Sequence, residues 1–159
     1  MTKQSEKFSF IAKQYCSWAE ESSLTQEEDV KKAIILLITL YSEALSLLKD
    51  GCGDEIDAKE VTDQEWKIIY TRFSSLPFNY YFASFSPAKL DEEQGMGDVA
   101  DDLADIYRDI KNGLWLFENG NITEAVWEWK QTFNTHWGRH AVSALNTLHC
   151  YVADEYIEF

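Results

Sequence analysis

Residues 97–114, GDVADDLADIYRDIKNGL, decide the fold, because their apolar and acidic side chains separate at the helical period. At an advance of about 100° per residue, one side of this segment is apolar. That side carries Leu103, Ile106, Tyr107, Ile110 and Leu114. The opposite side is an aspartate stripe made of Asp98, Asp101, Asp102, Asp105 and Asp109. The pattern predicts an amphipathic helix over about residues 98–117 that packs its apolar face on a core.

Part of the aspartate stripe has a local explanation. Asp98 suits an N-cap, and Asp101 and Asp102 suit a first turn, where the helix dipole favours negative charge. Asp105 and Asp109 lie mid-helix, where aspartate is a poor helix former and like charges four residues apart repel. We expect these two to have partners elsewhere in the fold, with plain solvent exposure as the alternative.

The rest of the chain predicts four more helices. Two of them begin with a capping box, a threonine followed by a glutamate three residues later, at Thr25 and at Thr62. The helix that begins after Thr25 is expected to end at Gly51. The four expected helices cover residues 5–21, residues 26–50, a short stretch from 62 to 73, and residues 123–152 after a tight turn at 119–121. The sequence therefore predicts an all-α fold, an up-and-down bundle of about five helices, as a single domain over residues 1–159.

One long connection is rich in aromatic residues. Residues 76–97, LPFNYYFASFSPAKLDEEQGMG, contain both prolines of the chain. Its aromatic residues are too apolar for a purely solvated loop, so we expect four of them to pack across the end of the bundle. These are Tyr80, Tyr81, Phe82 and Phe85. Loops of this length in a compact domain are often functional.

The formal net charge of -14 excludes two classes of partner. A surface this acidic repels phosphate backbones and anionic lipids, so we expect no nucleic-acid binding and no membrane binding. The longest apolar run, residues 33–38, is far too short to span a bilayer. The three cysteines, Cys16, Cys52 and Cys150, form no C-x-x-C motif and predict free thiols. Since no apolar leader is present, we expect a cytoplasmic protein, and its many aromatic side chains leave room for a homodimer face.

The last expected helix carries histidines on the same line as aromatic residues. That line consists of Trp129, Phe133, His136, His140, Ser143 and Thr147, and Arg139 lies beside it. Because the first half is aromatic, we expect the line to be buried where it continues through the histidines.

The turn at residues 119–121 makes the last two expected helices antiparallel, so that facing residues have numbers summing to about 240. The facing pairs are then Asp105 with His136, Asp101 with Arg139, and Asp102 or Asp98 with His140. This register predicts an inter-helix cluster of acidic and basic side chains.

Two interpretations of this cluster stay open. It is either a closed structural network, which fixes the helix register at some cost in stability, or a site for a divalent metal ion. Two histidines four residues apart on one helix, with carboxylates from another helix, have the donor types that Zn²⁺ or a similar ion prefers. The candidate metal ligands are Asp101, Asp105, His136 and His140.

These interpretations lead to two functional hypotheses. The first is a module that binds a protein or a small ligand through the cluster. The second is a metal-dependent hydrolase that acts on a phosphorylated small molecule. The residues that would carry the hydrolase chemistry are Asp101, Asp102 and Asp105 as ion ligands, His136 or His140 as ligand or general base, and Arg139 for the anionic substrate.

Three stretches of the chain resemble an uncharacterised bacterial family, domain of unknown function 5063. They are DVADDLADIYRDIKNGL at 98–114, AVWEWKQTFNTHWGRHAVSALNTLH at 125–149, and LPFNYY at 76–81. The similarity covers roughly residues 8–150. The resemblance implies a small, all-helical bacterial protein and implies no activity.

Overall fold

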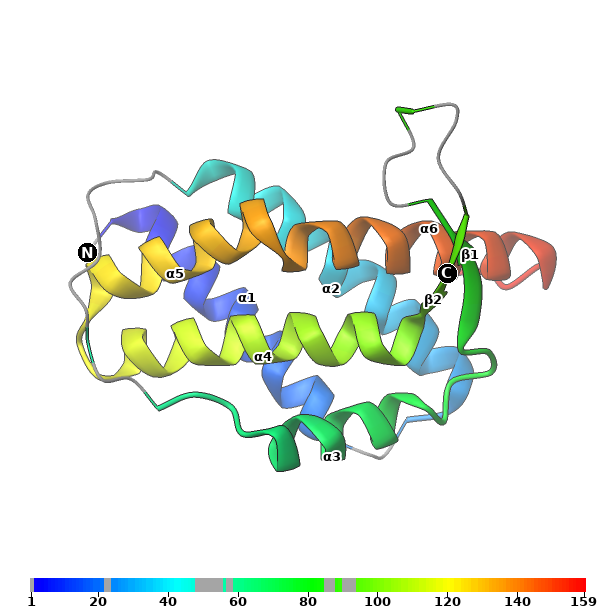
Figure 1. The fold of residues 1–159 in the computed structure, drawn as a ribbon, viewed down its shortest axis with the longest axis horizontal. Helices are drawn as coiled ribbons and strands as arrows, with labels where there is room; N and C mark the ends of the chain where they lie inside the picture. The colour runs from blue at the N-terminus through cyan, green and yellow to red at the C-terminus, as the bar shows by residue number, and fades with distance from the viewer. Residues whose placement is uncertain (1, 22–23, 48–55, 57–58, 85–87, 90–93) are drawn as a thin grey trace.

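A computed structural model describes all residues except 1, 22–23, 48–55, 57–58, 85–87 and 90–93. Its described part contains six helices and one small sheet (Figure 1). The helices are α1 (Lys3–Glu20), α2 (Gln26–Ser46), α3 (Asp63–Phe73), α4 (Val99–Glu118), α5 (Ile122–Thr135) and α6 (Trp137–Asp154). The strands are β1 (Tyr80–Ala83) and β2 (Gly95–Asp98). The predicted all-α bundle is confirmed, with a sixth helix and a two-stranded sheet added to it.

Helix α4 is the central element of the bundle. It packs against α1, α3, α5 and α6, and Figure 1 shows α5 and α6 running along one side of it and α3 along the other. Its side chains Leu103, Ile106 and Ile110 are completely buried, as the apolar face predicted. Each such side chain contributes about 1.5–3 kcal/mol of hydrophobic stabilisation. The aspartate stripe on the opposite side of α4 is therefore held in a fixed position.

Both predicted capping boxes are present. The hydroxyl of Thr25 accepts from the backbone N–H of Glu28, and Thr62 does the same for Glu65. Each glutamate carboxylate accepts in turn from the backbone N–H of its threonine. The expected stop at Gly51 lies outside the described residues. Within those residues, α2 ends at Ser46.

The prediction of a single helix over residues 123–152 is wrong, because the helix is interrupted at His136. His136 has φ -142° and ψ -85°, far from helical values, and α6 starts at the next residue in roughly the direction of α5 (Figure 1). The break lets the fully buried Trp137 enter the core, where its indole donates to the carbonyl of Trp129 at 3.2 Å. Gly138 allows this close approach, since a Cβ there would lie 2.3 Å from the carbonyl oxygen of Phe133.

The aromatic connection is also different from the expected loop, because part of it forms an antiparallel hairpin. Tyr81 pairs with Gly97, and the inward side chains on β1 are the half-buried Tyr81 and the buried Ala83. Tyr80 is 64% exposed and Phe82 is 89% exposed, so the expectation that they pack on the bundle is wrong. Successive side chains of a strand point to opposite faces, and only every second aromatic residue meets the bundle. Phe85 lies outside the described residues.

The two described cysteines, Cys16 and Cys150, are free thiols as expected, and Cys52 lies outside the described residues. Within the described part of the chain, none of the helices combines the length and the apolar composition that a bilayer crossing requires.

We expect Gly138→Ala to lower the free energy of unfolding by about 1–3 kcal/mol, because the new methyl group would overlap the Phe133 carbonyl. In a regular helix the same change stabilises by about 0.8–1.0 kcal/mol, so the sign of the effect tests the break. Urea denaturation measures it. Asn146→Ala at an exposed position of α6 is the control, with an expected effect within about 0.5 kcal/mol. A stabilised Gly138→Ala variant would show that the chain tolerates a continuous helix here.

Candidate metal centre

The aspartate stripe of α4 faces the junction between α5 and α6. Asp102 and Asp109 are buried, while Asp101 and Asp105 are partly buried. The stripe therefore does not simply face water. Asp98 has the predicted N-cap role, since its side chain accepts from the backbone of Ala100 and Asp101, and it also accepts from the hydroxyl of Tyr70 at 3.0 Å.

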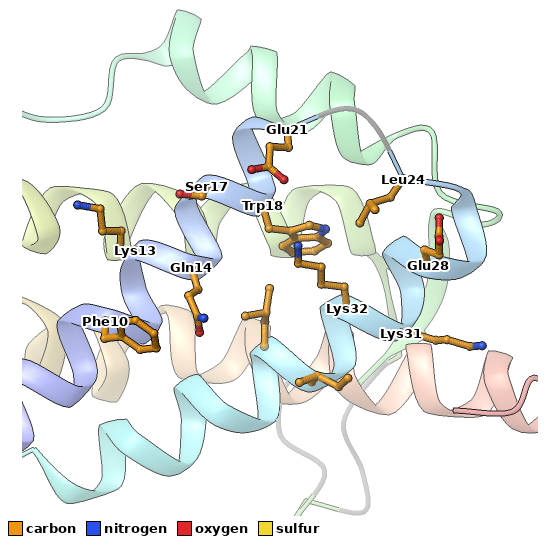
Figure 2. A pocket seen from close by; sticks show the side chains of 12 residues that line it. Phe10, Lys13, Gln14, Ser17, Trp18, Glu21, Leu24, Glu28, Lys31 and Lys32 are labelled. Atoms are coloured by element: carbon orange, nitrogen blue, oxygen red, sulfur yellow. The ribbon is translucent and has the colours of Figure 1, made fainter.

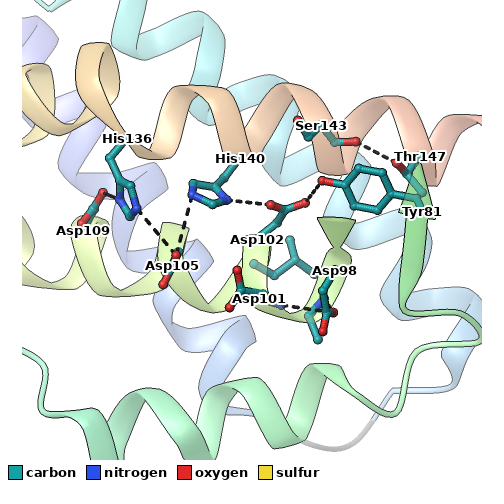
Figure 3. A network of polar contacts seen from close by, with 12 residues as sticks. Tyr81, Asp98, Asp101, Asp102, Asp105, Asp109, His136, His140, Ser143 and Thr147 are labelled. Atoms are coloured by element: carbon teal, nitrogen blue, oxygen red, sulfur yellow. Dashed lines mark hydrogen bonds and ion pairs between the residues drawn. The ribbon is translucent and has the colours of Figure 1, made fainter. Parts of the chain in front are cut away.

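Each histidine at the junction bonds a buried aspartate through Nδ1. His136 Nδ1 lies 2.7 Å from Asp109 Oδ2, and His140 Nδ1 lies 2.6 Å from Asp102 Oδ1 (Figure 3). Because an ionised carboxylate only accepts hydrogen bonds, both Nδ1 atoms carry the proton. In the neutral imidazole the other nitrogen, Nε2, then presents a free lone pair.

The two Nε2 atoms approach the same carboxylate oxygen. Asp105 Oδ2 lies 3.6 Å from His136 Nε2 and 3.7 Å from His140 Nε2. These three residues form a group in which one ligand atom from each lies within 4.8 Å of the others. Ligand atoms around a tetrahedral Zn²⁺ ion, each about 2.0–2.2 Å from the metal, are about 3.3–3.6 Å apart. The two distances to Asp105 are close to this value, and the three ligand atoms, all within 4.8 Å of one another, would move together to close around an ion.

The aspartates and histidines interlock across the two helices. Asp102, Asp105 and Asp109 are spaced by three and four residues, so Asp105 lies between the two histidines. The predicted pairs Asp105–His136 and Asp102–His140 are present. The bond of Asp109 to His136 and the 3.7 Å contact of Asp105 with His140 were not predicted. The register considered one face of each imidazole, although the ring has two nitrogens.

Asp105 is oriented by a tryptophan that the sequence did not indicate. The indole Nε1 of Trp66 on α3 donates to Asp105 Oδ1 at 2.8 Å. The guanidinium of Arg108 lies over the Trp66 ring, 5.3 Å from its centre. Since Oδ1 is engaged by the indole, Oδ2 is the oxygen that faces the imidazoles.

Tyr81 on the hairpin connects β1 to the histidine cluster, and the sequence did not indicate it either. Its hydroxyl donates to Asp102 Oδ2 at 2.6 Å, so Asp102 bridges Tyr81 and His140 (Figure 3). Gly97 on β2 makes room for the ring, since a Cβ there would lie 2.2 Å from Tyr81 Cζ. Trp66 and Tyr81 come from other elements of the fold, and no spacing on α4, α5 or α6 points to them.

A pocket of about 330 Å³ opens beside the histidines. Its walls include Asp101, His136, Arg139 and His140, so the predicted neighbours Asp101 and Arg139 share one cavity. Among the described residues no hydrogen bond or ion pair reaches the Asp101 carboxylate, and it is not in the metal-ligand group as the sequence had suggested. Burial, followed by the negative charge of Asp105, raises the pKa of Asp101.

The surrounding electrostatics favour protons or cations at the cluster. Burial opposes the charged form of His140, but its hydrogen bond to Asp102 and the nearby aspartate charges outweigh burial and raise its pKa. Burial raises the pKa of Asp109, although His136 acts in the opposite direction. Glu128 on α5 adds to this field, since burial and the charge of Asp109 raise its pKa.

Together the fold and the cluster define a helical-bundle protein with a polar, pocket-lining centre at a helix break. The chain belongs to the family described as Domain of unknown function (DUF5063), whose model matches residues 1–154. It is similar to the crystal structure of protein BF1032 from Bacteroides fragilis, with a TM-score of 0.79 and 22% sequence identity over 92% of this chain and 90% of that one. This likeness shows the fold alone. None of the curated proteins compared with the chain matches it.

We expect Glu128→Gln to raise the melting temperature at about pH 7.5 and to leave it nearly unchanged at about pH 4. The folded protein raises the pKa of Glu128 above its ordinary value of 4.5, so stability is highest with the carboxyl protonated and falls as pH rises through the folded pKa. Glutamine removes that loss. Glu124→Gln makes the same change on the same helix and serves as the control. Equal melting temperatures for Glu128→Gln and the parent at high pH would contradict the expected cost of this carboxylate.

Proposed function

We propose that this protein is a metal-dependent hydrolase whose ion is held by Asp105, His136 and His140. One observation carries the proposal: both imidazole Nε2 atoms face one oxygen of Asp105 while separate carboxylates fix both Nδ1 atoms. A histidine that ligates a metal through one nitrogen usually donates its other N–H to a carboxylate, which sets the tautomer and raises ligand basicity.

The donor set suits a transition metal rather than Mg²⁺ or Ca²⁺. Imidazole nitrogens favour Zn²⁺, Fe²⁺ and similar ions, whereas Mg²⁺ and Ca²⁺ prefer oxygen ligands alone. Three protein ligands leave at least one coordination position for water or substrate, as catalytic zinc sites require. The same donors also serve Fe²⁺ in oxygenases. The partly buried Asp101 favours hydrolysis, because activation of a metal-bound water needs a nearby proton acceptor.

The pocket gives each neighbouring group a role in this reaction. Asp101 lies one helical turn before Asp105 and would accept the proton of the water. Arg139 lines the same pocket and would meet an anionic group of the substrate. A phosphorylated small molecule fits these charges, and the pocket of about 330 Å³ limits it to a small one.

A binding module without a metal is the second candidate. The bonds of His136 to Asp109 and of His140 to Asp102 already satisfy these groups without an ion, and the pocket beside them would take a small ligand or a segment of a protein partner. In this case the cluster serves to hold the helices in register.

We also infer a cytoplasmic location and a bacterial source. The acidic composition and the free thiols of Cys16 and Cys150 support the location. The resemblance of the chain to a bacterial family supports the source.

Titration with Co²⁺ tests the metal centre, because Co²⁺ replaces Zn²⁺ and absorbs visible light. We expect one ion per chain, with affinity lowered at least about tenfold in His136→Ala and in His140→Ala, since each loses one of three ligands. His149→Ala on the exposed side of α6 is the matched control and should bind like the parent. Loss of binding in His149→Ala, or equal binding in all variants, would place the ion elsewhere.

A second variant separates the metal centre from a purely structural network. Asp102→Asn keeps the side-chain shape and leaves all three ligands in place, but it weakens the carboxylate bond to His140. We expect the Co²⁺ affinity to fall by about 10–100-fold. If the parent protein binds no Co²⁺ and the variants change only the stability of the fold, the binding module is favoured over the metal centre.

For the metal-loaded protein, Asp101→Asn should lower the hydrolysis rate of p-nitrophenyl phosphate by about 100-fold or more, because the proton acceptor is lost. The Co²⁺ affinity should stay unchanged, since Asp101 lies outside the ligand group. Asp154→Asn, which removes an exposed carboxylate at the end of α6, is the control. Equal rates in Asp101→Asn and the parent would remove Asp101 from the reaction.

A further inference from the structure

A second cavity, unrelated to the metal centre, lies between α1 and α2. This groove has a volume of about 720 Å³ and shares no lining residue with the pocket beside the histidines. Its apolar lining includes the buried Trp18 and Leu36 and the exposed Phe10 and Ile35. Figure 2 shows Phe10 and Trp18 on α1 on one side and lysines of α2 on the other. Exposed aromatic and aliphatic side chains gathered in one groove are typical of a binding surface.

The rim of the groove is less acidic than the protein as a whole, although Lys13 also pairs with Glu118 and Lys31 with Glu27. Its rim carries Lys13, Lys31 and Lys32, against Glu21 and Glu28. The whole chain has twice as many acidic as basic residues, 28 against 14. An apolar groove with a lysine rim is complementary to a segment that combines aromatic and acidic side chains.

Such a segment is present in the same chain, directly after α6. Residues 155–159, EYIEF, carry two glutamates and no basic residue. Tyr156 is 91% exposed and Phe159 is 69% exposed, so neither ring fills the groove of its own chain.

The backbone holds this segment in a defined shape. Tyr156 has φ 54°, a left-handed conformation that costs an L-residue about 1–2 kcal/mol. Two bonds of 3.0 Å close the turn, from Glu155 N–H to the carbonyl of Tyr151 and from Ile157 N–H to the carbonyl of Val152, and Ile157 packs against the core. The turn thus partly buries Ile157 and leaves the rings of Tyr156 and Phe159 exposed.

We propose that residues 155–159 of one copy dock in the α1–α2 groove of a second copy. Tyr156 and Phe159 would cover the apolar floor, and Glu155 and Glu158 would meet the lysine rim. Every copy carries both the segment and the groove, so we propose a reciprocal exchange, which would give a two-fold dimer with two identical contacts. A dimer joined in this way needs no metal and stands apart from the proposed hydrolase.

Sedimentation velocity over a range of protein concentrations tests the dimer. The double variant Tyr156→Ser with Phe159→Ser changes the docking segment, and Ile35→Glu changes the groove. We expect each of the two to raise the dimer dissociation constant at least about tenfold. Phe82→Ser removes an equally exposed aromatic ring from the hairpin and should leave the dimer unchanged. Far-ultraviolet circular dichroism and thermal unfolding report whether each variant is folded.

A charge exchange makes the test specific for the proposed pairing. Lys31→Glu with Lys32→Glu should weaken the dimer, and adding Glu155→Lys with Glu158→Lys in the same chain should restore it. A folded parent that stays monomeric at every concentration would overturn the proposal. A dimer that none of these changes weakens, or one that the charge exchange does not restore, would overturn it equally. A parent protein that stays monomeric but binds a different acidic and aromatic partner in this groove would also overturn the proposal.

Discussion

Two buried carboxylates on the central helix, Asp102 and Asp109, are the constraint on which the site depends. Burying an unpaired carboxylate costs several kcal/mol, so each needs a donor that reaches it inside the bundle. The Nδ1 atoms of His140 and His136 are those donors. Because they are used in this way, both Nε2 atoms remain available, and the interlocked spacing directs them to Asp105. The pairing that stabilises the helix contact thus also brings together the three side chains of the proposed metal site.

The helix break at His136 determines where the imidazoles of His136 and His140 lie relative to α4. Trp137 needs the break to reach the core, and Gly138 tolerates the resulting approach of the Phe133 carbonyl. The same residue that departs from helical geometry supplies one of the imidazoles, so core packing and site geometry are coupled at one point of the chain. The hairpin adds a second constraint through Tyr81, which ties the pocket wall to Asp102.

Local patterns predicted the parts of this structure that depend on local interactions. The apolar face of α4, the boxes at Thr25 and Thr62, and the approach of Asp105 to His136 follow from helical spacing and one short turn. The helix break and the hairpin did not follow, because the first depends on packing around Trp137 and the second on pairing between distant residues. Trp66 could not be predicted for the same reason, since the fold alone brings α3 to Asp105.

We propose above all that one metal ion binds among Asp105, His136 and His140. Crystals of the protein soaked or grown with Zn²⁺ and measured at the zinc absorption edge test it most directly. We expect a single strong anomalous peak about 2.0–2.2 Å from both Nε2 atoms and from a carboxylate oxygen of Asp105. An anomalous map with no peak between these three side chains, or with zinc only at surface carboxylates, would contradict it.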